Sequence, residues 1–324
     1  MENTNNNLLI ASSPHIHSSN SLDLAMRDVL LALLPAVFAA ILFFGLHSFL
    51  VITVCAISAV FAEFVAQKIM KRTVSISDGS AALTGVLLAL CLPPSIPLWI
   101  AAIGAISAII IGKQVFGGLG HNIFNPAHVG RAILLASWPV AMTTWTLPMA
   151  ADAIASATPL ALMKANNFAE LPSLASMFLG NISGSIGETS ALALLLGGAY
   201  LIWRGQIDWK IPASYLGTVA ILTSIYGAIN GLGVIYPFYH LFSGGLMIGA
   251  FFMATDWVTS PITKKGRLIF GICLGILTVL IRLKGGLNEG VCYSILIMNM
   301  ATPLIDRYSK ARIFGKKRKE PKHE

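Results

Sequence analysis

Long runs of apolar residues follow one another along the chain, and glycine, proline or charged residues separate them. We interpret the runs as ten membrane-spanning helices, because a helix of about 20 apolar residues crosses the hydrocarbon core of a bilayer. The third and fifth runs are short and contain glycine or proline, which predicts broken helices that face protein or a cavity. The runs cover residues 29–46, 50–66, 80–93, 96–112, 126–140, 188–203, 211–229, 238–255, 268–282 and 286–304.

The composition supports this interpretation. Hydrophobic residues make up 56% of the 324 residues and charged residues only 11%, whereas a soluble domain carries roughly a quarter charged residues. This excludes a soluble globular protein, a disordered chain and a nucleic-acid-binding protein. The net charge of +8 does not change the conclusion, because eight of the 22 basic residues lie between Arg307 and Lys322, in a solvated tail.

The basic residues also predict the orientation. With the N-terminus in the cytoplasm, 18 of the 22 Lys and Arg residues lie in cytoplasmic segments and three lie in outer segments. Cytoplasmic loops of membrane proteins carry this excess of positive charge. We therefore expect both termini in the cytoplasm and the longest loop, residues 141–187, on the external face.

A weak internal similarity predicts that the ten spans form two halves. At an offset of 164 residues, Gly85 meets Gly249 and Pro97 meets Pro261. Five spans are an odd number, so two such halves would be inverted in the membrane, as in many transport folds. The expected fold is therefore all-α, with an N-terminal arm (1–28), a first half (29–140), an external loop (141–187), a second half (188–304) and a basic tail (305–324).

Polar residues at membrane depth are the candidates for function. The segment 117–132 opens the fifth span and contains Asn122, Asn125 and Arg131. It is either a re-entrant turn, in which the asparagines satisfy backbone groups, or a ligand cavity in which Arg131 faces an anionic group. The four cysteines show no C-x-x-C spacing, so we expect no metal or iron–sulfur site.

Acidic residues next to the spans have similar alternatives. Asp78 precedes the third span and Asp256 follows the eighth. Each is either a helix cap or part of an ion or cofactor site. Glu289 lies near Arg282 and Lys284, which we expect to neutralise its charge.

The external loop contains a hydroxyl of interest. Thr158 precedes Pro159, which favours an extended backbone at the threonine. Its neighbours Ser156 and Ala157 are small, so we expect the hydroxyl to be reachable by a modifying enzyme. From composition alone, this segment is a turn of small residues.

Nearly the whole chain resembles one family of bacterial membrane subunits. That family comprises the D subunit of the Rnf ferredoxin:NAD oxidoreductase complex and the B subunit of the sodium-pumping NADH:quinone reductase. The motifs that carry the resemblance are SPHIH (13–17), DVLLALLPA (28–36), DGSAALTGVLLAL (78–90), GGLGHNIFNPA (117–127), FMATDWVTSP (252–261), EGVCYSILIMN (289–299) and PLIDRY (303–308).

The resemblance implies covalent FMN, joined through its phosphate to a threonine hydroxyl by a flavin transferase. Asp152, Ala157 and Thr158 match the attachment motif, which makes Thr158 the acceptor. Ser156 replaces the usual glycine, and Ala155 replaces a serine or threonine. The resemblance also implies a second, non-covalent flavin, either riboflavin or FMN. Candidate residues for that flavin or for an ion are Asn122, Asn125, Arg131, Asp78 and Asp256.

The implied function is that of a multi-pass protein in the bacterial cell (inner) membrane. It would work with the A, B, C, E and G subunits to couple ferredoxin/NAD electron transfer to Na⁺ or H⁺ translocation. Thr158 would lie on the periplasmic side. Arg131 is a candidate for stabilising an anionic reduced flavin. The alternative is a small-solute channel or transporter with two inverted five-helix halves and no redox role. A passive membrane scaffold is a third interpretation.

Overall fold

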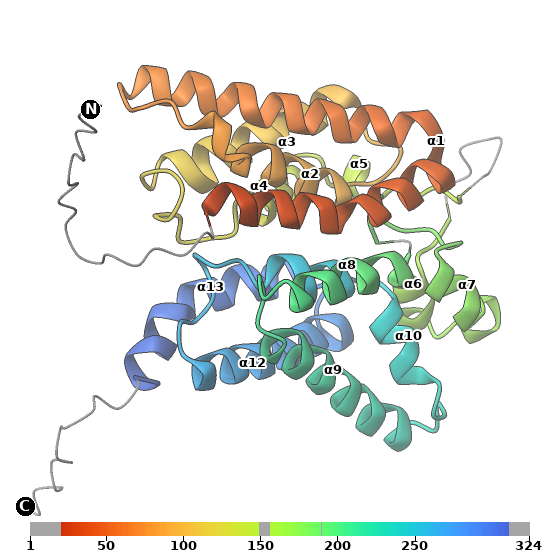
Figure 1. Cartoon of the computed structure of the whole chain (residues 1–324). Coiled ribbons are helices and arrows are strands. Elements are labelled where there is room, and N and C mark those ends of the chain that lie inside the picture. Colours follow the sequence, from red (N-terminus) through yellow and green to blue (C-terminus); the bar gives the residue numbers. More distant parts are fainter. Residues whose placement is uncertain (1–20, 149–155, 189, 311–324) are drawn as a thin grey trace, which may run out of the picture.

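The computed structural model describes residues 21–148, 156–188 and 190–310. Helices and turns, without a β-sheet, build these ranges, which confirms the expected all-α fold. The helices form two layers (Figure 1): α1 to α5 lie in one, and α8 to α13 lie in the other, with α6 and α7 at one end.

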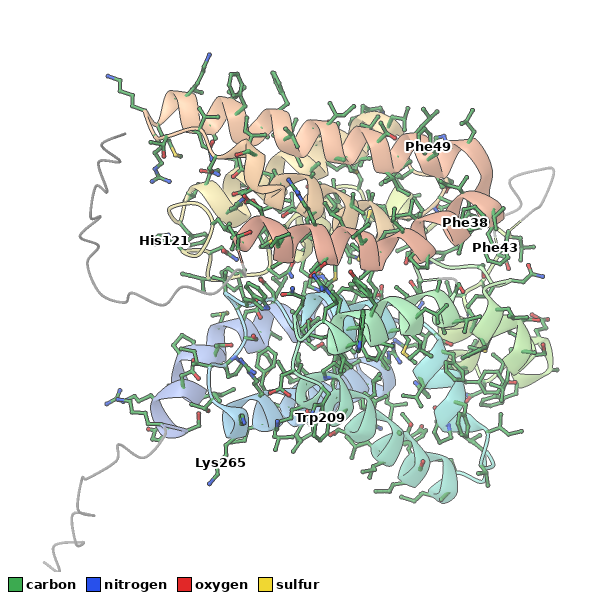
Figure 2. The ribbon with its side chains drawn as sticks, viewed as in Figure 1. Phe38, Phe43, Phe49, His121, Trp209 and Lys265 are labelled. Carbon is green, nitrogen blue, oxygen red and sulfur yellow. The ribbon has the colours of Figure 1, made fainter. Side chains whose placement is uncertain are left out.

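Three of the described helices are long and apolar enough to cross a membrane: α1 (Leu22–Ile69), α9 (Lys210–Ile229) and α12 (Lys264–Lys284). Large side chains such as Phe38, 65% exposed, and Phe49, 45% exposed, lie on the surface of α1 (Figure 2). Such apolar surface suits contact with lipid, and the protein is an all-α membrane protein. The count of ten spans and the inverted repeat remain predictions.

Helix α1 contains the first two predicted spans. It reverses direction at Gly45, whose φ of 70° lies in the left-handed region. Glycine adopts this conformation without steric cost, so a single residue makes the sharp turn. The two arms of α1 therefore run antiparallel along one side of the first layer (Figure 1).

The other helices are shorter, and several follow one another across breaks. The first layer continues with η1 (Ile76–Asp78), α2 (Ser80–Leu90), α3 (Leu98–Ile109), the π-helical turn η2 (Ile110–Gln114), α4 (Pro126–Ser137) and α5 (Pro139–Thr143). The connecting segment contains α6 (Pro159–Lys164), η3 (Phe168–Glu170) and α7 (Leu174–Leu179). The second layer also contains α8 (Ala191–Trp203), α10 (Tyr236–Phe242), α11 (Leu246–Ile248), the π-helical turn η4 (Gly249–Met253) and α13 (Val291–Tyr308).

The eighth predicted span is broken, which the apolar pattern did not reveal. Helix α10 ends at Phe242 and the chain resumes as a helix at Leu246. The buried guanidinium of Arg282 donates hydrogen bonds to the carbonyl oxygens of His240 and Ser243, at 2.6 and 3.0 Å. A cation at this helix C-terminus satisfies carbonyl groups that hydrocarbon cannot.

The end of the predicted external loop packs into the interior. Residues 182–188 are buried, and the amides of Ile186 and Gly187 donate to the carbonyl oxygens of Leu92 and Leu90 at 2.9 and 2.7 Å. These carbonyls belong to the broken end of α2. The loop therefore supplies hydrogen-bond donors to carbonyl groups that the end of α2 leaves unpaired.

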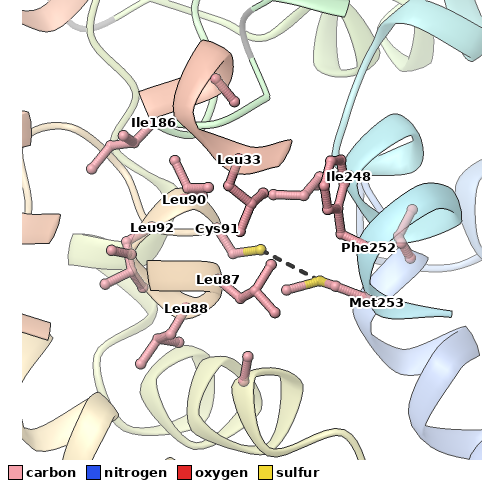
Figure 3. Packing of buried hydrophobic residues seen from close by; sticks show 14 of the residues in the cluster. Leu33, Leu87, Leu88, Leu90, Cys91, Leu92, Ile186, Ile248, Phe252 and Met253 are labelled. Carbon is pink, nitrogen blue, oxygen red and sulfur yellow. Dashed lines mark hydrogen bonds between the residues drawn. The ribbon is translucent and has the colours of Figure 1, made fainter. Parts of the chain in front are cut away.

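The interface between the layers is apolar at its centre (Figure 3). Leu87 and Cys91 of the first layer pack towards Phe252 and Met253 of the second, and the sulfur atoms of Cys91 and Met253 are 3.8 Å apart. Near one end of the interface, Asp28 on α1 accepts hydrogen bonds from Arg204. Dispersion contacts thus join the layers at the centre, and an ion pair joins them near one end.

Helices α1 and α8 approach closely because α8 has glycine at the contact. A Cβ atom at Gly197 would collide with the carbonyl oxygen of Ala32. Small residues allow helix backbones to approach closely in membranes.

We expect Gly197→Val to force the layers apart. Overpacking of this kind costs about 2 kcal/mol, so the variant should unfold at a clearly lower temperature in detergent. Gly217→Val on α9 is the matched control, because a Cβ atom at Gly217 meets nothing within 4 Å. Equal melting temperatures for the two variants would contradict the close contact between α1 and α8.

Candidate functional site

Two cavities lie between the layers, and most of the described candidate residues line one or the other. The Thr158 cavity has a volume of about 230 Å³, and its lining includes Thr158 and Arg131. The Asn122 cavity has a volume of about 310 Å³, and its lining includes Asn122, Asn125 and Asp256. The structure therefore divides one set of sequence candidates between two places.

Thr158 occupies the N-cap of α6. Its backbone is extended, with φ −71° and ψ 155°, as the following proline predicts. The side-chain oxygen accepts a hydrogen bond from the amide of Ala161 at 3.3 Å, a common N-cap interaction. The small neighbours had suggested an open loop surface. Thr158 is instead only 8% exposed and lines the wall of a cavity.

Hydrogen bonds to two other segments hold the residues before Thr158 in place. Ser156 and Ala157 line the same cavity as Thr158. The amide of Ser156 donates to the carbonyl of Trp145 at 2.9 Å, and the hydroxyl of Ser183 donates to the carbonyl of Ala157 at 2.8 Å. These contacts hold the threonine in place. Asp152, the remaining motif residue, lies outside the described residues.

Arg131 lies in the Thr158 cavity and pairs with Glu289. Its Nη1 donates to Oε1 of Glu289 at 2.9 Å, and its Nη2 contacts Oε2. The amide of Gly245 donates to the same Oε1 at 3.0 Å. This ion pair joins α4 of the first layer to the segment before α13 of the second.

The prediction that Arg282 and Lys284 neutralise Glu289 was wrong. Arg282 is close in sequence, but its guanidinium donates to carbonyl oxygens, including that of Glu289 itself at 3.0 Å. The broken α10 needs those donors. The carboxylate therefore pairs with Arg131, a residue 158 positions away, which local sequence reasoning could not identify.

Glu188 is a further charged residue of the Thr158 cavity, and the sequence analysis missed it. Its Oε2 accepts hydrogen bonds from the hydroxyl and the amide of Ser185, at 2.7 and 3.3 Å. It stands at the start of the sixth apolar run, and no motif marks it in the sequence. Only the re-entrant path of residues 182–188 brings it to the cavity.

The asparagines at the Asn122 cavity differ in role. Asn125 caps α4 by accepting from the amides of Ala127 and His128, as expected for a turn, and its Nδ2 donates to the carbonyl of Met253 at 3.3 Å. Asn122 donates to the carbonyl of Phe124, but its buried Oδ1 has no hydrogen-bond partner among the described residues. A ligand that donates a hydrogen bond would satisfy this oxygen.

The two aspartates accept hydrogen bonds from residues that follow them closely in the chain. Asp78 accepts from the amide and hydroxyl of Ser80 at the start of α2, at 2.9 and 2.6 Å. Asp256 accepts from Val258 and Thr259 in the turn after η4. Asp256 also lines the Asn122 cavity, whereas Asp78 lies behind Ser80, which lines it.

The walls of the Asn122 cavity are mostly apolar. They come from α1, α2, α4, α8 and η4, and a few polar groups interrupt them. Cavities of this character suit small organic ligands, which the polar groups orient. The Thr158 cavity instead combines a hydroxyl with an ion pair, which suits a ligand that carries charge.

Comparison with known proteins identifies similar chains. A family model described as the NQR2, RnfD, RnfE family matches residues 9–315. The chain is 50% identical over 319 residues to the D subunit of the proton-translocating ferredoxin:NAD(+) oxidoreductase complex of Clostridium ljungdahlii, with 95% of this chain and 96% of that protein covered.

Two further relatives cover almost the same length. The chain is 49% identical over 311 residues to the D subunit of the Na(+)-translocating ferredoxin:NAD(+) oxidoreductase complex of Acetobacterium woodii, with coverages of 95% and 96%. It is 37% identical over 344 residues to the D subunit of the ion-translocating oxidoreductase complex of Citrobacter koseri, with coverages of 94% and 98%.

The Arg131–Glu289 pair can be tested by a double-variant cycle. Arg131→Met leaves the Glu289 carboxylate without its cation, and breaking a buried pair in this way costs about 3 kcal/mol. We expect a marked fall in the thermal stability of the purified protein. Glu289→Gln in the same chain should restore much of it, since the uncompensated charge is then absent. Strictly additive losses in stability would contradict the pairing.

Proposed function

The chain belongs to the NQR2, RnfD, RnfE family, and we propose that it is the D subunit of a membrane complex that couples electron transfer between ferredoxin and NAD to translocation of Na⁺ or H⁺. The observation that carries this proposal is the similarity to D subunits of such complexes over 94–95% of the chain. The partners are then the A, B, C, E and G subunits of an Rnf-type complex in a bacterial cell membrane.

The Thr158 hydroxyl is the proposed attachment point of covalent FMN, through a phosphoester made by a flavin transferase. Two features support this assignment: Thr158 stands in an extended N-cap position, and its side chain lines a cavity that Ser156 and Ala157 leave open with small side chains. A bound flavin passes one or two electrons and so links nicotinamide to iron–sulfur carriers. The chain's own contribution is a tether that keeps the flavin at high local concentration.

Arg131 belongs to this covalent site and not to a second one. It lines the Thr158 cavity, where its guanidinium is held by Glu289. Because Glu289 offsets its charge, Arg131 offers a flavin a hydrogen-bonding guanidinium of fixed position rather than a net positive charge. Its position in that lining is the reason to group Arg131 with Thr158 rather than with Asn122 and Asn125.

The second, non-covalent flavin, riboflavin or FMN, is proposed for the Asn122 cavity. The apolar walls suit a planar ring, and the unpartnered Oδ1 of Asn122 can accept a hydrogen bond from a ring N–H or a ribityl hydroxyl. Asn125 and Asp256 also line this cavity, and local hydrogen bonds hold their side chains in place.

The orientation follows from the distribution of basic residues. Eighteen of 22 Lys and Arg residues lie in segments that we place in the cytoplasm, together with both termini. This places the Thr158 segment on the external, periplasmic side. The tethered flavin then lies at the opposite side of the membrane from ferredoxin and NAD.

The covalent flavin can be tested on a denaturing gel. With a flavin transferase present, the wild-type chain should show flavin fluorescence at about 34.5 kDa, and Thr158→Val should abolish the fluorescence, because the phosphoester needs the hydroxyl. Thr143→Val, which alters another threonine that lines the same cavity, should keep it. A dark wild-type band would favour the small-solute transporter or the passive scaffold.

The second flavin can be tested by extraction. We expect Asn122→Leu to weaken retention of the flavin that acid releases, by about fivefold in dissociation constant, since one hydrogen bond is worth about 1 kcal/mol. Asn230→Leu, an exposed position at the end of α9, is the control. Equal flavin release from both variants would place the second flavin elsewhere.

A further inference from the structure

The lining of the Thr158 cavity carries an uncompensated negative charge. Arg131, Glu188 and Glu289 are the charged residues of that lining. The guanidinium of Arg131 pairs with the carboxylate of Glu289, so these two charges offset each other. Within the described residues, Glu188 forms no ion pair, although its side chain is only 8% exposed.

The two other basic side chains near the cavity donate hydrogen bonds to backbone carbonyl oxygens and not to Glu188. Arg282 of α12 donates to the carbonyls of His240 and Ser243. Lys164 at the end of α6 donates to the carbonyls of Gly285 and Leu287. The other titratable groups on the neighbouring elements are His128 on α4, Cys91 after α2, and Cys292 and Tyr293 on α13.

The geometry of Glu188 leaves one oxygen free for a ligand. The hydroxyl and amide of Ser185 both donate to Oε2 and so fix the carboxylate. In the part of the chain that the structure describes, Oε1 accepts no hydrogen bond, and Glu188 lines the cavity. A carboxylate withdrawn from water without a counter-charge is unfavourable, and binding of a proton or a small cation removes the penalty.

We propose that Glu188 binds one monovalent cation, a proton or Na⁺, and that its occupancy is linked to the charge of the flavin on Thr158. This inference rests on the proposed function. When a one-electron donor of the complex, an iron–sulfur centre or a flavin, delivers one electron, one negative charge enters the cavity. Uptake of one monovalent cation at Glu188 adds one positive charge, so the net charge of the cavity is unchanged.

The linkage is reciprocal. A cation on Glu188 makes the flavin easier to reduce, and reduction raises the affinity of Glu188 for the cation by the same factor. The coupling is strengthened because Glu188 is buried, and charges interact more strongly inside a protein than in bulk solvent. The same carboxylate can serve a proton or Na⁺, in line with nearly equal identities to a proton-translocating relative (50%) and a Na⁺-translocating relative (49%).

The test is a redox titration of the full-length chain, purified with its flavin transferase, at several pH values and NaCl concentrations. The covalent flavin is the part of the signal that Thr158→Val removes. We compare wild type with Glu188→Gln, which mimics the cation-loaded carboxylate, and with Glu188→Asp, which keeps the charge. Glu170→Gln, in the exposed turn η3, is the matched control.

At limiting cation, we expect the wild-type flavin to have a lower reduction potential than Glu188→Gln. With saturating protons or Na⁺, the two potentials should converge. The difference should change by about 59 mV for each tenfold change in cation for a one-electron step. Glu188→Asp should keep the cation dependence, and Glu170→Gln should match wild type. If the two reduction potentials converge only in acid, the cation at Glu188 is a proton. If they converge on addition of NaCl, it is Na⁺.

Three other results would each overturn the proposed cation site. A fluorescent wild-type band with the same potential as Glu188→Gln at every pH and NaCl concentration overturns the cation site and leaves the flavin attachment intact. A wild-type chain without covalent flavin overturns the attachment at Thr158, and this inference with it. Loss of covalent flavin in Glu188→Gln and Glu188→Asp together, with retention in Glu170→Gln, would show a role in flavinylation and would also overturn the cation site.

Discussion

The need to satisfy backbone and charged groups without water governs this structure. Hydrocarbon offers no hydrogen bonds, so each broken helix must find partners inside the protein. The segment 182–188 supplies amides to the end of α2, and Arg282 supplies donors to the end of α10. These two solutions hold the re-entrant segment and the start of α13 in place, and the walls of the Thr158 cavity follow from them.

The same constraint explains why the candidate residues gather at the interface between the layers. Broken helices expose polar groups, and these groups must face another part of the protein rather than lipid. The Thr158 cavity collects Arg131, Glu188 and Glu289 from three separate segments. The Asn122 cavity brings Asn122 together with Asn125, and the buried Oδ1 of Asn122 remains available to a ligand. The apolar centre around Cys91 and Met253 packs between the layers in the same interface.

The proposed redox function uses the charge arrangement in a specific way. A tethered flavin needs little from the protein beyond position and electrostatics. The Arg131–Glu289 pair is neutral as a unit and joins the layers, so it provides position. Glu188 provides the electrostatic response, because its charge is the one that a mobile cation can cancel. Electron transfer and cation binding would thus meet in one cavity, where a change in one alters the free energy of the other.

The sequence by itself determined the fold class and the family, and it made Thr158 a candidate, because apolar runs, glycine and proline breaks, and contiguous motifs are local properties of the chain. It also predicted the extended backbone at Thr158, and it gave local hydrogen bonds to backbone groups as one of two roles for Asn125 and Asp78. Only the tertiary structure decided that Arg131 pairs with Glu289, that Arg131 shares a cavity with Thr158 rather than with Asn122, and that Glu188 takes part. The reason is physical: the partner of a buried charge is set by which segments pack together across the interface, and neither spacing nor hydropathy encodes that distance.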